Sequence, residues 1–239
     1  MAIKIRDKGV LLGKVIFEND IPLENPMNRN LVAEVSMRRP KVFGKGKHKV
    51  ILLDCGTKNN IIRTLLEMAD ITLKVVPWNY DVTKEEYDGL FISNGPGDPS
   101  IVKETIESIS KAYKIGKPIF GICMGHQLMA LAAGAKTYKL KYGNRGQNQP
   151  CIDTLSNRVF ITPQNHGYAV DSTSLPPEWK TYFLNVNDGS NEGIFHSHRP
   201  FFSVQFHPEA RSGPFDTSFL FHQFFHLVEK FKEGKIFLS

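Results

Sequence analysis

Residues 118–128 read PIFGICMGHQL, in which an apolar run passes through a glycine-flanked cysteine into a run with helical spacing. This order is that of a nucleophile elbow, with the sulfur of Cys123 in place of the more common serine hydroxyl. Gly121 and Gly125 suit the sharp turn on which a nucleophile stands, because larger flanking side chains would clash there. The helix that follows places backbone N–H groups and a positive dipole end beside the sulfur, which favours thiolate.

Strand and helix signals alternate on the amino-terminal side of this turn. Short apolar runs typical of buried parallel strands occur at 49–56, 72–78 and 89–93, and helical spacing occurs at 59–69 and 101–114. This succession predicts an α/β fold with a mainly parallel central sheet and helices on both faces.

The sequence pattern changes beyond Gly134, where six strand-like runs follow: KTYKL, RVFITP, YAVDS, TYFLNV, GIFHS and FFSVQF. We expect them to form antiparallel additions to the sheet, followed by a last helix over 216–231. Residues 1–47 differ again, with scattered charges and a turn-rich stretch, NDIPLENPMNRN. The sequence therefore predicts a tail or linker over 1–47 and one folded domain over 48–239.

The bulk composition excludes several function classes. The net charge of +6 is spread along the chain without a nucleic-acid-binding motif, so no nucleic-acid partner is expected. Three cysteines are too few for a disulfide framework and suit a reducing, cytoplasmic setting. No apolar run approaches the roughly 18 residues that span a bilayer, so no membrane association is expected. Two histidine pairs, His196 with His198 and His222 with His226, have the spacing of zinc ligands but no clustered Cys or acid to complete a site, so no metal site is expected either.

A thiol nucleophile needs a base that is itself held by a third group. The apolar run 201–206 leads into His207-Pro-Glu209, and side chains two positions apart on an extended chain point to the same side. The sequence therefore predicts that Glu209 orients His207 beside Cys123. On its own, the sequence His-Pro-Glu would indicate a surface turn. Its combination with the cysteine elbow is what favours a catalytic role.

Acyl transfer also needs donors for a tetrahedral oxyanion. The first is the backbone N–H of Met124, directly after the nucleophile. The second is expected from the strand-end loop SNGPGDP (93–99), where Gly95 and Gly97 allow close backbone approach, although this sequence is also common in ordinary tight turns. Cys55 and Cys151 lack such surroundings and are expected to be small buried hydrophobic residues.

The motifs SNGPGDP, GICMGHQ and FHPE, in this order, resemble those of the class I (triad) glutamine amidotransferases. The segments GAKTYKLKYGNRGQNQP and ITPQNHGYAVD are similar to the glutaminase domain of carbamoyl-phosphate synthetase, particularly the eukaryotic, pyrimidine-pathway type. The resemblance runs from about Gly9 to Phe231. It implies the flavodoxin-like class I glutaminase fold and an amidohydrolase that acts on glutamine.

The resemblance implies a role for each matching position. Cys123 would attack the side-chain amide of glutamine and form a γ-glutamyl thioester. His207 would protonate the leaving ammonia and then activate water, and Glu209 would hold His207. Backbone N–H groups of Gly95 and Met124 would bind the oxyanion. The remaining implied glutamine contacts are Gly97, Gln127, Asn165, Gly167 and Tyr168, the last standing where relatives often carry Phe. His166 is expected to be structural.

The resemblance also implies a partner, an ATP-grasp carbamoyl-phosphate synthetase domain or subunit that receives the ammonia. ATP, magnesium and bicarbonate are expected in that partner, and no cofactor in this domain. Only the last part of the family's N-terminal domain matches, at about 2–21, so a fragment of a larger polypeptide is expected. Ammonia-dependent urea-cycle relatives lack the nucleophilic cysteine, and its presence here implies glutamine hydrolysis. Two alternatives remain: a docking or regulatory module with little activity alone, and a hydrolase of other γ-glutamyl amides.

Overall fold

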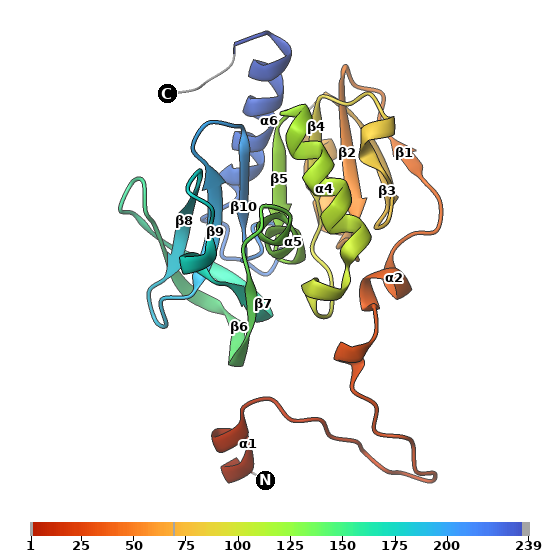
Figure 1. Ribbon diagram of the computed structural model, residues 1–239, viewed down its shortest axis with the longest axis vertical. Coiled ribbons are helices and arrows are strands. Elements are labelled where there is room, and N and C mark those ends of the chain that lie inside the picture. The colour runs from red at the N-terminus through yellow and green to blue at the C-terminus, as the bar shows by residue number, and fades with distance from the viewer. Residues whose placement is uncertain (1, 69, 236–239) are drawn as a thin grey trace.

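The computed structural model describes residues 2–68 and 70–235, which build a ten-stranded sheet with helices on both sides (Figure 1). The strands are β1 (Lys41–Phe43), β2 (His48–Asp54), β3 (Ile71–Pro77), β4 (Gly89–Ile92), β5 (Ile119–Ile122), β6 (Thr137–Asp153), β7 (Val159–Val170), β8 (Trp179–Asn185), β9 (Asn191–His196) and β10 (Phe201–Val204). Their order across the sheet is β1-β3-β2-β4-β5-β10-β9-β7-β6-β8.

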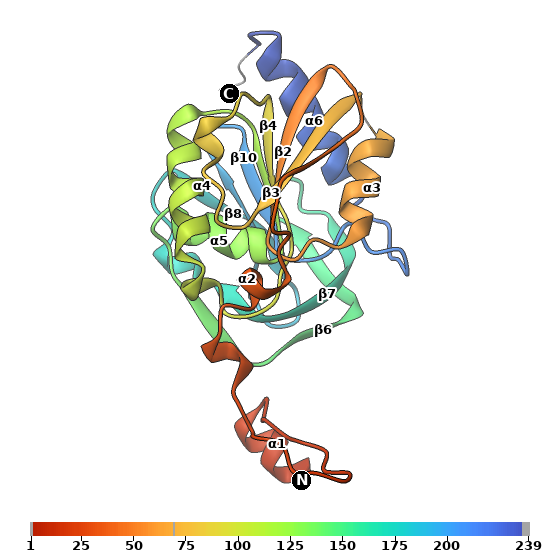
Figure 2. The same cartoon turned by 90° about the vertical axis from the view of Figure 1, so that its right-hand side faces the viewer.

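Helices cover the two faces of the sheet in pairs (Figure 2). The α-helices are α1 (Ala2–Lys8), α2 (Leu31–Val35), α3 (Asn59–Met68), α4 (Lys103–Ile115), α5 (Met124–Ala132) and α6 (Phe219–Lys232). One core cluster lies between the sheet and α4 with α5, and a second lies between the sheet and α3 with α6. The predicted helices on both faces are therefore present, although the last helix begins at Phe219 rather than near residue 216.

Apart from the antiparallel edge strand β1, the first half of the sheet is parallel. Strands β3, β2, β4, β5 and β10 pair in parallel register, with Ile92 opposite Gly121 and Gly121 opposite Ser203. These strands are covered on both faces, which explains why their sequences are nearly continuous apolar runs. Their carboxyl ends meet at one edge of the sheet, and the cysteine turn follows β5, which lies between β4 and β10, at that edge.

The second half is antiparallel and closes on itself. Strands β9, β7, β6 and β8 pair antiparallel in that order, and β8 also pairs with β9. The sheet is therefore mixed, and the expectation of a mainly parallel sheet with antiparallel additions understated this half. Two runs expected as separate strands, RVFITP and YAVDS, belong largely to the single strand β7. Closure depends on pairing between strands far apart in sequence, which local periodicity does not encode.

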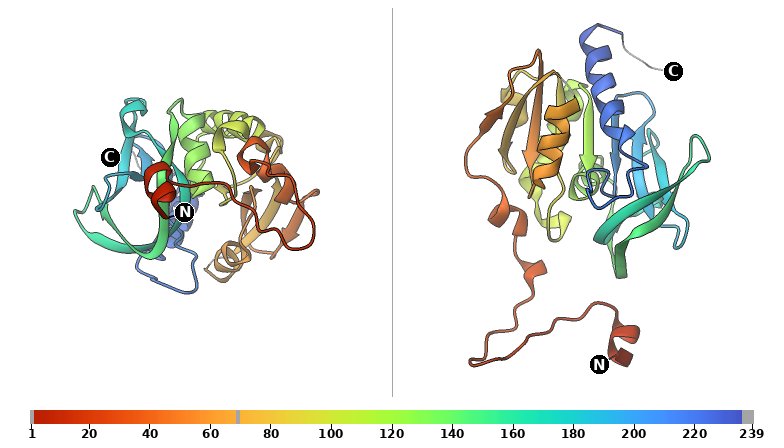
Figure 3. Two further views of the ribbon diagram at one scale, coloured as in Figure 1. Left: turned by 90° about the horizontal axis from the view of Figure 1, so that it is seen from below. Right: turned by 180° about the vertical axis from the view of Figure 1, so that it is seen from behind.

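The folded body begins before residue 48. Val32 of α2 is fully buried in the core, and β1 pairs antiparallel with β3 and forms one edge of the sheet. Residues 2–30 form an arm that leads away from the body and returns, so that α1 lies beyond β6 (Figure 3). The arm touches the body where Val10 N–H donates to the carbonyl of Lys141 at 3.2 Å. Within the described ranges, no helix is long and apolar enough to cross a bilayer.

Candidate active site

The turn between β5 and α5 holds Cys123 in a backbone conformation that side-chain-bearing residues rarely adopt, with φ of 54°. A Cβ on Gly125 would lie 2.3 Å from the carbonyl oxygen of Ile92, and one on Gly121 would lie 2.7 Å from the carbonyl carbon of Gly125. Both positions therefore require glycine. Helix α5 begins at Met124, so its first N–H groups have no acceptor within the helix and are available to an anion beside the sulfur.

The thiol of Cys123 is buried, with a relative exposure of 5%. Burial alone would raise its pKa, but the positive charges of His207 and, less strongly, His166 outweigh burial and hold the pKa below its ordinary value. Cys55 and Cys151 are also buried, and burial raises the pKa of both thiols. Cys123 is thus the one cysteine of the three whose surroundings favour the nucleophilic thiolate.

His207 and Glu209 meet as predicted, although on a turn rather than on a strand. His207 Nδ1 lies 2.7 Å from Glu209 Oε1, and both side chains are almost completely buried. Burial would lower the pKa of His207, but the charge of Cys123 and the hydrogen bond to Glu209 raise it to about 10. His207 Nε2 has no hydrogen-bond partner among the described residues, which leaves this nitrogen for the sulfur and for reacting groups.

Lys58 is a member of the site that the sequence did not single out. Its Nζ lies 3.3 Å from Glu209 Oε1 and 3.2 Å from His207 Nδ1. Burial would raise the pKa of Glu209, but His207 and Lys58 together hold it below its ordinary value. Lys58 follows the carboxyl end of β2, the same sheet edge that carries Cys123, and that position is the signal that could have identified it.

A cavity of about 700 Å³ opens over the cysteine at this edge. Its lining includes almost every residue predicted from the sequence: Gly95, Gly97, Cys123, Met124, Gln127, Asn165, Gly167, Tyr168 and His207. Glu209 lies behind His207 and does not line it. Val10, Leu11 and Leu12 of the amino-terminal arm also contribute to the lining. The volume is large enough for a small-molecule ligand and does not by itself define its size.

The loop after β4 approaches Cys123 from the neighbouring strand. A Cβ on Gly95 would lie 2.1 Å from the carbonyl oxygen of Cys55, and Gly97 has φ of 95°. Asn94 Oδ1 accepts a hydrogen bond from Lys58 N–H at 3.0 Å, which fixes the loop against the start of α3. The glycines therefore serve a tightly packed loop whose N–H groups border the cavity.

The predicted glutamine contacts on α5 and β7 are joined to each other. Gln127 Nε2 donates to the carbonyl of Tyr168 at 3.0 Å and to Gln205 Oε1 at 2.9 Å. The Tyr168 hydroxyl interacts with Asp98, and burial together with this carboxylate raises its pKa to about 12. Asn165 and Gly167 border the cavity on the same strand. Among the described residues, no group of three His, Cys, Asp or Glu side chains could hold a metal ion.

The sequence matches the family model described as Glutamine amidotransferase class-I over residues 51–227. It is 54% identical to multifunctional protein pyr1-3 of Dictyostelium discoideum, over 92% of this chain and 11% of that protein. It is 51% identical to multifunctional protein CAD of Squalus acanthias, over 97% of this chain and 11% of that protein. It is 50% identical to the Homo sapiens protein named carbamoyl-phosphate synthase (ammonia), mitochondrial, over 97% and 16%. The chain thus spans between 11 and 16% of the length of these relatives.

Solved structures share the fold. A putative GMP synthase subunit from Thermoplasma acidophilum aligns with a TM-score of 0.68 and 24% identity, over 81% of this chain and 99% of that one. A glutamine amidotransferase from Thermotoga maritima aligns with a TM-score of 0.57 and 17% identity, over 79% of this chain and 86% of that one.

Proposed function

The chain belongs to the class I glutamine amidotransferase family, and on that premise we propose that it hydrolyses L-glutamine to glutamate and ammonia. The observation that carries the proposal is the meeting of a buried, glycine-flanked Cys123 with His207 at one cavity, where backbone N–H groups also converge. Glu209 holds the imidazole from behind. This set contains the nucleophile, the acid–base group, its orienting carboxylate and the oxyanion donors of acyl transfer.

The charges of the site suit both halves of the reaction. The Cys123 thiolate attacks the side-chain amide carbon, and N–H groups of Gly95 and Met124 stabilise the resulting oxyanion. The protonated Nε2 of His207 gives its proton to the leaving nitrogen, which departs as ammonia and leaves a thioester. The sulfur then carries no charge, so the larger of the two interactions that raise the pKa of His207 is lost, and the one with Glu209 remains. His207 can now take a proton from water, which attacks the thioester and releases glutamate.

We infer that the ammonia is consumed by an ATP-grasp carbamoyl-phosphate synthetase domain or subunit, where ATP, magnesium and bicarbonate would act. Support comes from the names of relatives at about 50% identity. Those names include an ammonia-type synthase, so overall identity does not separate glutamine-using from ammonia-using proteins. Cys123 favours a glutamine-using protein, because thioester chemistry requires a nucleophilic cysteine. A cytoplasmic location stays a prediction from the sparse cysteines.

The same assignment extends to the fold and its divisions. We infer that β3, β2, β4, β5 and β10 with their helices correspond to the flavodoxin-like core of the family. We also infer that residues 1–47 include the end of a preceding N-terminal domain. Exposed apolar side chains on the arm support this, since Val15 is 90% and Phe17 is 92% exposed.

The direct test is glutamate release from glutamine by the wild type and by Cys123→Ala. We expect the variant to lose turnover at unchanged thermal stability, with Cys55→Ala as the matched cysteine control that keeps it. Equal release by wild type and Cys123→Ala would refute the triad assignment.

The same assay separates the two alternatives. A docking module would form no thioester on Cys123 when incubated with glutamine alone, as followed by intact mass. A different γ-glutamyl hydrolase would show a higher kcat/KM for a γ-glutamyl peptide than for glutamine.

A further inference from the structure

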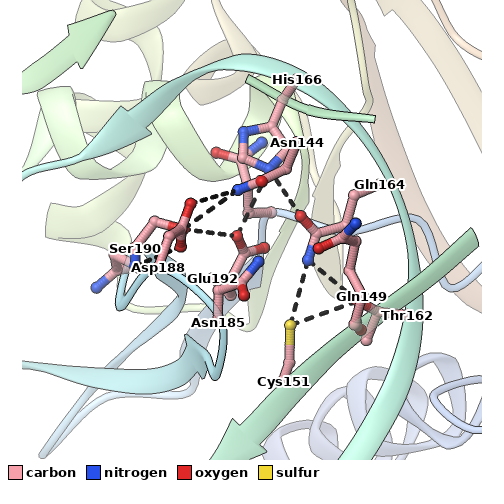
Figure 4. Close-up of polar contacts among 12 residues, drawn as sticks. Asn144, Gln149, Cys151, Thr162, Gln164, His166, Asn185, Asp188, Ser190 and Glu192 are labelled. Atoms are coloured by element: carbon pink, nitrogen blue, oxygen red, sulfur yellow. Dashed lines mark hydrogen bonds and ion pairs between the residues drawn. The ribbon is translucent and has the colours of Figure 1, made fainter. Parts of the chain in front are cut away.

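A second buried ion pair lies beside the cavity, between β7 and β9 (Figure 4). The side chains of His166 and Glu192 are 1% and 0% exposed, and His166 Nε2 lies 3.5 Å from Glu192 Oε1. Neither residue has a role in the reaction steps above. Because charged groups are costly to bury, the protonation state of this pair has consequences for its neighbours.

Hydrogen bonds around the ring fix that state, beginning with Gln164. Thr162 Oγ1 donates its single hydrogen to the carbonyl of Gln149 at 2.8 Å, since a carbonyl can only accept. Thr162 Oγ1 must then accept from Gln164 Nε2, which lies at 3.1 Å. The opposite end of the amide, Gln164 Oε1, therefore faces His166 Nε2 at 3.0 Å. An oxygen that only accepts requires a proton on His166 Nε2.

The other ring nitrogen meets an acceptor as well. His166 Nδ1 lies 2.9 Å from the carbonyl oxygen of Tyr168, which also only accepts. Both nitrogens of His166 therefore donate, and a doubly protonated ring is an imidazolium. Glu192 is the buried carboxyl group beside the ring: burial raises the pKa of Glu192, whereas His166 and the hydroxyl of Ser190, 3.2 Å from Glu192 Oε1, favour its charged form.

We propose that Glu192 is a positioning residue that holds His166 as an imidazolium, and that this buried charge stabilises the Cys123 thiolate together with His207. The same imidazolium anchors the Tyr168 carbonyl, to which Gln127 of α5 also donates, so it fixes β7 against the helix that follows the nucleophile. The proposal rests on the glutaminase assignment only for its catalytic consequence, because thiol ionisation can be measured without turnover.

The charged surroundings support this direction. Burial would lower the pKa of His166, but Glu192, the Cys123 charge and the Tyr168 carbonyl raise it. The titratable groups that influence His166 or lie beside it are Glu192 of β9, Asp188 before β9, Cys123 and His126 at the start of α5, and Arg145 of β6 opposite Asn165. His166 and Cys123 both line the cavity, and the charges that influence Cys123 are those of His207, His166 and Glu209. Two cationic rings therefore outweigh one carboxylate at the sulfur.

The first test needs no variant of the pair. In protein labelled with nitrogen-15 at its eight histidines, the ring signals of His166, assigned by their loss in His166→Gln, report the protonation of each nitrogen. We expect both nitrogens to be protonated at pH 7. A neutral tautomer at that pH would overturn the proposal.

The second test measures the pKa of Cys123 from the pH dependence of its alkylation by iodoacetamide. Glu192→Gln keeps the shape of the side chain and removes its charge, so we expect the midpoint to rise by about one pH unit. His166→Gln should raise it similarly, and the double variant should add little. Glu107→Gln, on the exposed side of α4, is the control for loss of a carboxylate and should leave the midpoint unchanged.

A purely structural role for the pair would lower thermal stability without moving the midpoint, and that outcome would also refute the proposal. If Glu192→Gln fails to fold, the alkylation midpoint of His166→Gln and the ring signals of the wild type still test the proposal. A shifted midpoint without glutamate release in the wild type would uphold this inference and count against the proposed function, so the two can fail separately.

Discussion

His207 Nδ1 lies 2.7 Å from Glu209 Oε1, although β10 ends at Val204 and neither residue belongs to a strand. The turn that carries them is fixed by backbone contacts instead. His207 N–H donates to the carbonyl of Pro163 on β7, and Ala210 N–H donates to the carbonyl of His207. The antiparallel half of the sheet therefore helps to set the geometry of a base that serves a nucleophile on the parallel half.

Glu209→Gln should lower kcat for glutamine hydrolysis by about 10²-fold, and less than loss of the imidazole would. The amide keeps the size of the side chain but no longer stabilises the imidazolium, so His207 loses part of the interaction that raises its pKa. Glutamate release under saturating glutamine measures the effect.

The matched control is Glu67→Gln. Glu67 forms an exposed salt bridge with Arg211, and exposed pairs contribute little. Equal kcat values for Glu209→Gln and Glu67→Gln would contradict the assigned role of Glu209.

Iodoacetamide at pH 7 should modify Cys123 selectively in the folded protein. Its pKa lies below the ordinary thiol value, so thiolate is present at lower pH than for a free cysteine, whereas burial raises the pKa of Cys55 and Cys151. Peptide mapping by mass spectrometry identifies the modified residue. All three cysteines should react at similar rates in denaturant, and similar rates in the folded protein would show that Cys123 is not activated.

Lys58→Met should move the acidic limb of the kcat profile to higher pH. Lys58 helps to hold the pKa of Glu209 below its ordinary value, so removing the ammonium lets that pKa rise. As the pH falls, the carboxylate is then protonated at a higher pH than in the wild type. At that point it no longer serves as a charged partner of His207. Lys111→Met removes an exposed lysine that pairs with Glu107 on α4 and serves as control. An acidic limb that coincides with that of the wild type would argue against coupling between Lys58 and the His207–Glu209 pair.

The cysteine turn, the His207–Glu209 pair and the glycine-bearing loop could be predicted because each is a local pattern. Gly121 and Gly125 flank the nucleophile in sequence, and their packing shows the steric need for them. The parallel strands before Gly134 could be predicted equally well, since each is a short apolar run followed by a segment with helical spacing.

What the sequence did not predict depends on pairing across long separations. The closing of β8 onto β9 joins strands whose local patterns allow several partners. Lys58 reads as an ordinary lysine at the start of a helix until the fold brings its Nζ to Glu209. His166 was expected to be structural, and its charge became evident only from the acceptors on both sides of the ring.

Gly125→Ala tests the steric basis of the elbow. The added Cβ would lie 2.3 Å from the carbonyl oxygen of Ile92, a backbone atom of β4 that cannot move without disturbing the parallel ladder. We expect a loss of about 1–3 kcal/mol in the free energy of unfolding, measured by urea denaturation, and a larger fractional loss of kcat because α5 and Cys123 shift together. Gly13→Ala is the matched control, since a Cβ there has no neighbour within 4 Å. If Gly125→Ala retained both stability and kcat, the turn would tolerate a side chain, and the tight contact with β4 could not be what positions the nucleophile.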